Sequence, residues 1–164
     1  MESLVLRDAP VVLTSDLHNL GAGEAFLTDA VSVKDVSNLG VPGVRVFYKI
    51  TMGSSSPGPG ASLAFYTLFS DGDTLMDAGV PETNDILDGA STPTLAEVLT
   101  TLPAPAHTVS LVNAVDLVYQ GSFFVPLDSV ASFSLIVLNN SLSDLSTTFG
   151  DHKLTYVASR FSSS

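Results

Sequence analysis

The sequence contains no cysteine and no tryptophan among its 164 residues. Without cysteine the chain can form neither a disulfide framework nor a metal site with thiolate ligands. A chain of this length is long enough to bury an apolar core within a single domain. We therefore expect its stability to come from packing of that core or from assembly with other subunits.

Charge is scarce as well, and positive charge in particular. Charged residues make up 14% of the chain, against about 25% in a typical soluble domain. There are 6 Lys and Arg residues against 17 Asp and Glu residues, which gives a formal net charge of −11. Nucleic-acid binding needs clustered cations that displace counterions from phosphates, and anionic membranes likewise attract basic segments. The charge balance therefore predicts no nucleic-acid partner and no membrane partner.

Long hydrophobic runs are missing too. Apolar stretches such as Phe123–Pro126 and Leu135–Leu138 are far shorter than the roughly 20 residues of a membrane-spanning helix. The first ten residues include Glu2, Arg7 and Asp8 and lack a basic start followed by an apolar run. We therefore expect no secretory signal there.

The sequence does contain short apolar runs bounded by turn residues, which predict β-strands. Val44–Met52 alternates apolar and polar residues with period two, as a half-buried strand does. Three further runs lie between Tyr119 and Arg160. Pro126 closes the first, Asn139-Asn140 closes the second, and the third follows Gly150-Asp151. These runs are Ser122–Val125, Ser132–Leu138 and Lys153–Ala158. Shorter candidates are Val11–Thr14, Val31–Val33, His107–Asn113 and Val115–Gln120.

Two predicted strands are apolar on both faces. In Ser62–Ser70 and Ser132–Leu138 apolar side chains fall at both odd and even positions. Each face of such a strand needs cover. We expect the opposite sheet to cover one face and a neighbouring subunit to be a candidate for the other.

One segment has helical rather than strand periodicity. Within Thr94–Leu102 the apolar residues are spaced i, i+3, i+4 and i+7, and Thr94 and Glu97 have capping-box spacing. Pro103 and Pro105 stop the segment. It predicts a short helix that covers one end of the sandwich.

The connections differ in composition. Gly53–Gly60 is rich in Gly, Ser and Pro and lies between two predicted strands, so we interpret it as a hairpin loop. Asp71–Thr92 contains six acidic residues and no basic one, and loops of this length are often functional. Asp71, Asp73 and Asp77 could bind calcium, but the spacing departs from the twelve-residue calcium loop, and a solvated acidic turn is the simpler interpretation.

Together these features predict an all-β fold: an antiparallel two-sheet β-sandwich of the jelly-roll type, with one short helix and an N-terminal arm. We assign residues 1–30 to the arm or first strand. Residues 31–164 are assigned to the jelly-roll domain. The arm could lie on a partner or on the chain's own sheet.

The sequence contains no motif for catalysis. There is no G-x-S-x-G elbow, and His18, His107 and His152 have no metal-ligand spacing with one another. We expect them to be exposed or to lie at sheet edges. We accordingly predict no catalytic residue, no cofactor and no metal ligand, and a protein that is not an enzyme. The alternative is an enzyme on a sandwich scaffold that uses His18 or His107 as its base.

The C-terminal part of the chain resembles a known class of proteins. Tyr119-Gln120-Gly121-Ser122-Phe123-Phe124 leads to a break at Pro126, a strand ends at Asn139-Asn140, and a polar loop reaches Gly150 before the last strand. With the loop at 53–60, this order resembles the small jelly-roll structural proteins of tailed bacteriophages, among them the capsid decoration (cement) proteins.

The resemblance implies a structural role in the virion, at the capsid surface. Such proteins commonly form trimers on the capsid lattice and reinforce the head. The implied partners are copies of the chain itself and the major capsid protein. The alternative is a tail or head-fibre module that binds a receptor or carbohydrate, with the acidic segment 71–92 as its contact surface.

Overall fold

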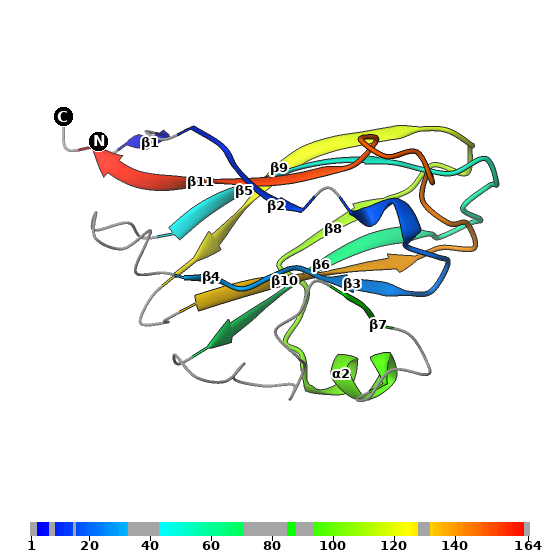
Figure 1. Cartoon of the computed structure of the whole chain (residues 1–164), viewed down its shortest axis with the longest axis horizontal. Coiled ribbons are helices and arrows are strands. Elements are labelled where there is room, and N and C mark those ends of the chain that lie inside the picture. Colours follow the sequence, from blue (N-terminus) through cyan, green and yellow to red (C-terminus); the bar gives the residue numbers. More distant parts are fainter. Residues whose placement is uncertain are drawn as a thin grey trace.

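In the described part of the chain, two antiparallel β-sheets pack face to face, and one α-helix lies outside them (Figure 1). The computed structural model describes residues 3–6, 9–14, 16–32, 43–70, 85–87, 94–127 and 132–162. The strands are β1 (Ser3–Leu6), β2 (Val11–Thr14), β3 (Ala25–Leu27), β4 (Val31–Ser32), β5 (Gly43–Thr51), β6 (Ser62–Ser70), β7 (Asp85–Leu87), β8 (His107–Ser110), β9 (Val118–Pro126), β10 (Ser132–Asn140) and β11 (Lys153–Ser162). The helices are the 3-10 turn η1 (Leu17–Asn19) and the α-helix α2 (Leu95–Thr101).

The strand pairing is nested. β6 pairs with β8, β5 with β9, β3 with β10, and β2 with β11. The first sheet has the order β1-β11-β5-β9, and β2 also pairs with β11; the second has the order β7-β3-β10-β6-β8, and β4 also pairs with β10. Nested antiparallel pairs wound into two sheets form a jelly roll, so the predicted fold class is confirmed.

The segment 53–60 was interpreted wrongly as a hairpin loop. β5 pairs with β9 and β11 in the first sheet, whereas β6 pairs with β8 and β10 in the second. The connection therefore crosses from one sheet to the other. Turn residues between two strands predict that the chain reverses, but they do not show which strand will be the neighbour.

The main core lies between the sheets. Val44, Val46, Tyr48 and Ile50 on β5 are buried, while the residues between them are half-buried. The period-two pattern of Val44–Met52 is therefore confirmed. These side chains meet Phe65 and other apolar residues of the second sheet in one cluster.

A second, smaller cluster covers the outer face of the second sheet. Leu95 and Val98 of α2 pack there with Leu68 and Ile136. The two apolar faces predicted for β6 and β10 are thus both covered within the chain. Where Leu68 and Ile136 lie, the outer cover is α2, and not the neighbouring subunit that the sequence offered as a candidate. Figure 1 shows α2 beneath this sheet rather than at one end of the sandwich, so the predicted helix is confirmed but its predicted place is wrong.

The helix α2 begins as the sequence predicts. The Thr94 side chain accepts a hydrogen bond from the Glu97 N–H, and the Glu97 carboxylate accepts one from the Thr94 N–H at 2.9 Å. This reciprocal arrangement is a capping box.

The strand β9 joins two segments that were predicted as separate strands, Val115–Gln120 and Ser122–Val125. It runs without interruption through Gly121. A Cβ on Gly121 would lie 2.4 Å from the Tyr48 hydroxyl oxygen. Glycine at this position therefore leaves room for an aromatic ring rather than marking a turn.

The chain's first and last strands lie side by side. Ser3 is opposite Ser162, and Leu6 is opposite Ser159. In the described part of residues 1–30, β1, β2 and β3 all pair within the two sheets.

The acidic segment Asp71–Thr92 is described only at β7, a strand that we did not predict. Asp71, Asp73 and Asp77 lie outside the described residues. In the described part of the chain no helix has the length and hydropathy that a membrane span would need.

Candidate functional site

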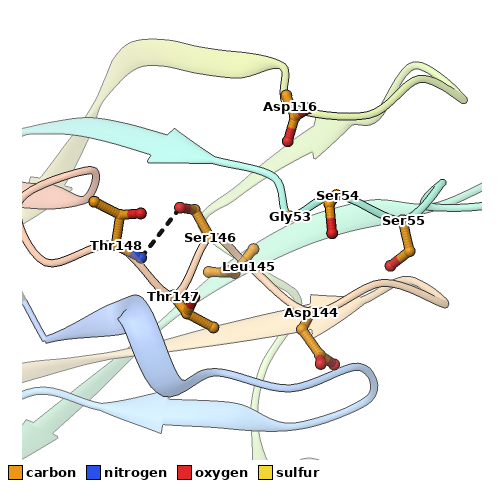
Figure 2. Close-up of a pocket in the computed structure, with 9 residues that line it drawn as sticks. All are labelled: Gly53, Ser54, Ser55, Asp116, Asp144, Leu145, Ser146, Thr147 and Thr148. Carbon is orange, nitrogen blue, oxygen red and sulfur yellow. Dashed lines mark hydrogen bonds between the residues drawn. The ribbon is translucent and has the colours of Figure 1, made fainter.

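A polar cleft of about 280 Å³ opens at one end of the sandwich (Figure 2). The nested pairing places the connections β5–β6, β8–β9 and β10–β11 together at this end. Each connection contributes residues to the cleft. The lining residues are Gly53, Ser54, Ser55, Asp116, Asp144, Leu145, Ser146, Thr147 and Thr148.

Backbone hydrogen bonds join the three connections to one another. The Gly53 N–H donates to the Asp144 carbonyl at 3.0 Å, and the Asp116 N–H donates to the Gly53 carbonyl at 3.1 Å. A Cβ on Gly53 would lie 2.7 Å from the Asp144 carbonyl oxygen. The floor of the cleft therefore needs glycine at position 53, because a side chain would push these connections apart.

Two carboxylates come from different connections of the cleft. Asp144 accepts a hydrogen bond from the Ala22 N–H at 2.9 Å, which ties a fourth connection to the same end. Asp116 has a left-handed backbone with φ of 54°, a conformation that Asp tolerates better than most residues. Figure 2 shows the Asp144 carboxylate directed away from Asp116. Within the described ranges no group of three or more His, Cys, Asp or Glu residues could hold a metal ion.

His152 lies at the same end and is buried, so the expectation that all three histidines are exposed or at sheet edges is wrong for this residue. Its Nδ1 lies 3.3 Å from the Thr51 backbone nitrogen, and its Nε2 lies 2.7 Å from the Ser146 carbonyl oxygen. Because the Thr51 N–H can only donate, Nδ1 accepts and the proton sits on Nε2. Burial lowers the pKa of His152 below 6.5, and the hydrogen bond to Ser146 and the charge of Asp151 oppose that effect only in part.

Ser146, Asp151 and His152 include the three residue types of a hydrolase triad, but their contacts differ from it. In a triad the imidazole contacts the serine hydroxyl as its base. Here the Ser146 hydroxyl donates to the Asp151 carboxylate at 2.6 Å, and the imidazole contacts the Ser146 carbonyl instead. These side chains fix the β10–β11 connection, and they do not form an activated nucleophile.

His107 belongs to a different cluster, at the edge strand β8. Its ring stacks on Phe123 with centroids 5.1 Å apart and an interplanar angle of 12°. Its Nε2 lies 3.2 Å from the Tyr48 hydroxyl, and burial raises the pKa of that hydroxyl. Phe65 completes the cluster. The aromatic rings close the gap between the two sheets at this edge.

His18 lies in η1 and contacts the Phe149 ring edge-on, with centroids 5.8 Å apart. The structure therefore brings His18 and His152 to the cleft end and places His107 elsewhere. The cleft itself was not predicted. Its residues are common polar types in three separate loops, and only the strand order brings them together.

The cleft presents hydroxyls, backbone groups and two carboxylates. Such groups exchange hydrogen bonds with a neutral or cationic polar ligand, and the carboxylates disfavour an anion. Comparisons with protein-family models and with curated proteins give no significant match to this chain.

Proposed function

We propose that this chain is a virion structural protein, a capsid decoration protein that stabilises the head through contacts with its own copies and with the major capsid protein. The observation that carries the proposal is the jelly-roll strand order. Viral capsid domains use this architecture repeatedly. Because a fold can host many functions, the proposal also draws on the resemblance of the segment from Tyr119 to Gly150 to phage proteins.

Two further observations support an assembly role. Residues with large apolar side chains are exposed on several elements, among them Val118, Phe124, Leu142 and Phe149. Charged residues make up 14% of the chain, and interfaces are depleted of charge. The apolar outer faces of β6 and β10 do not support an assembly role where α2 covers them.

The test is reconstitution with capsids that lack the protein. The purified chain should rebind such capsids at a fixed stoichiometry and raise the temperature at which they break open. Sedimentation of the free protein should show an oligomer, with a trimer expected. A monomer without affinity for capsids would overturn the proposal.

The polar cleft favours a second candidate, a tail or head-fibre module that binds a carbohydrate or receptor. Its hydroxyls and the Asp116 carboxylate suit the hydroxyl groups of a sugar. Glycan-array binding that is lost in Asp116→Asn would support this function. Binding that also disappears with a chelator would point to calcium at the acidic segment 71–92, and an array without any binding would speak against the candidate.

A further inference from the structure

Exposed apolar side chains gather at the end of the sandwich that holds the cleft. Four connections meet there, at 16–24, 52–61, 111–117 and 141–152, and we call this surface the loop end. Eight large apolar residues are exposed in the described part of the chain, and five of them lie in these connections or directly beside them. The five are Val112, Val115, Val118, Leu142 and Phe149. Exposed apolar side chains that gather on one surface mark a site of interaction.

A second hollow, of about 250 Å³, lies beside the cleft at the loop end. Its lining residues are Pro57, Pro59, Gly60, Ala61, Asn140, Ser141 and Leu142. We call it the proline hollow. The same two connections, β5–β6 and β10–β11, line both this hollow and the cleft. The loop end therefore presents two neighbouring hollows, one of them polar and the other bordered by proline and leucine side chains.

Hydrogen bonds fix the ridge between the two hollows. The Ser143 hydroxyl donates to the Ser55 carbonyl at 2.8 Å, and the Leu142 N–H donates to the Pro57 carbonyl at 2.9 Å. These bonds join the two connections at the point where the lining of the cleft gives way to that of the proline hollow. A preformed surface loses little conformational entropy when a partner binds.

The loop end carries negative charge without any Lys or Arg. Its four connections hold five acidic residues, which are Asp16, Glu24, Asp116, Asp144 and Asp151. Asp144 and Asp151 accept hydrogen bonds from groups of the loop end itself. Asp116 is exposed, and no described residue donates a hydrogen bond to its carboxylate. This carboxylate can therefore accept a hydrogen bond from an incoming cation.

We propose that the loop end binds a polypeptide segment that presents a Lys or Arg side chain next to an apolar one. The cation contacts Asp116 in the cleft, and the apolar side chain packs against Leu142 in the proline hollow. Charge selects this partner, because the five carboxylates repel the phosphates of nucleic acids and of anionic lipids. A carbohydrate could occupy the cleft but has no apolar side chain for the proline hollow. Such a site requires neither capsid contact nor self-association, so it goes beyond the proposed function.

The test uses a short synthetic peptide in which one Arg lies between two Leu residues, flanked by Gly and Ser. Two control peptides replace the Arg by Glu or both Leu residues by Ser. Each is titrated into the isotope-labelled full chain and followed by NMR. We expect the Arg peptide to shift amide signals within 53–61, 111–117 and 141–148, and to bind more weakly as salt is added. Both control peptides should bind more weakly than the Arg peptide.

Two variants of the protein separate the two hollows. Asp116→Asn removes the charge and keeps a residue that tolerates the left-handed backbone, and Leu142→Ser removes the apolar contact. The matched controls are Asp29→Asn and Val12→Ser, which change an exposed acid and an exposed apolar residue outside the loop end. We expect each loop-end variant to bind the Arg peptide roughly threefold to fivefold more weakly, as the loss of an exposed contact predicts. The control variants should bind it like wild type.

Equal binding of the Arg and Glu peptides would overturn the proposal, as would shifts confined to other parts of the molecule or no shifts at millimolar peptide. A loss in Asp116→Asn without any loss in Leu142→Ser would reduce the site to the cleft alone and would overturn binding across two hollows. Equal losses in the loop-end and control variants would show non-specific attraction to an acidic protein. Unchanged melting temperatures of the variants would exclude unfolding as the cause of a loss.

Discussion

At the scale of single residues, His152 shows how a buried titratable group makes the fold sensitive to pH. Its two ring nitrogens are satisfied by backbone groups of Thr51 and Ser146 only in the neutral form. Protonation of Nδ1 would direct a second N–H against the Thr51 N–H. The Thr51 N–H would then lose its acceptor, and with it one link between the end of β5 and the β10–β11 connection.

We predict that acid destabilises the protein through His152. The folded pKa lies below 6.5, so the unfolded chain binds the proton more readily. This contribution to stability is therefore complete above the unfolded pKa, and it falls as the pH drops below about 6.5 towards the folded pKa. Chemical denaturation at pH 7 and pH 5 should show a smaller pH dependence in His152→Asn, whose amide oxygen can still accept from Thr51. An identical pH dependence in both proteins would contradict the assignment.

Gly121 gives a second prediction at this scale. In Gly121→Ala the new methyl group meets the Tyr48 hydroxyl at 2.4 Å, and overpacking of this kind costs about 1–3 kcal/mol. Tyr48→Phe removes the atom nearest to the new methyl, so the double variant should lose less than the sum of the two single losses in urea denaturation. Strict additivity would show that the ring and the glycine do not interact.

At the scale of elements, α2 combines a local start signal with a packing role. Thr94→Ala removes the capping box and should cost about 1 kcal/mol in the free energy of unfolding. Hydrogen bonds to the backbone and the side chain of Thr94 lower the pKa of Glu97. In Thr94→Ala this pKa should rise towards its ordinary value, as measured by an NMR titration. Thr100→Ala is the control, since its exposed hydroxyl bonds only to a carbonyl one turn back. An equal loss in both variants would indicate that capping is not the cause.

The elements that could be predicted from sequence are those with a local signal. The alternation of Val44–Met52 and the capping spacing of Thr94 and Glu97 depend on residues next to one another in the chain. The inter-sheet path of 53–60 depends on which strands pair, and that is decided by contacts distant in sequence. The cleft and the buried state of His152 depend on the same contacts, because Thr51 is about a hundred residues away from His152.

At the scale of the whole molecule, the two ends of the chain contribute unequally to the first sheet. β11 is paired along both edges, with β5 on one and with β1 and β2 on the other. β1 lies at the edge of the sheet, and among the described strands it pairs only with β11.

We therefore predict that truncation is tolerated at one end only. Removing Lys153–Ser162 takes the partner from β1 and β2 and exposes one edge of β5, so the chain should fail to unfold cooperatively. Removing the residues up to Leu6 strips an edge strand and should leave a folded, less stable sandwich. Thermal unfolding followed by circular dichroism distinguishes the two truncated proteins. A cooperative transition in the protein without β11 would contradict the nested pairing.

The pairing of Ser3 with Ser162 also fixes where an attached cargo would go. β11 begins beside the cleft at Lys153 and runs for 10 residues, which spans about 30 Å in an extended strand. Ser3 and Ser162 therefore lie side by side, far from the cleft (Figure 1). A reporter fused to either end would project from the side opposite the cleft, so fluorescent or enzymatic fusions can be made at either end without obstructing it.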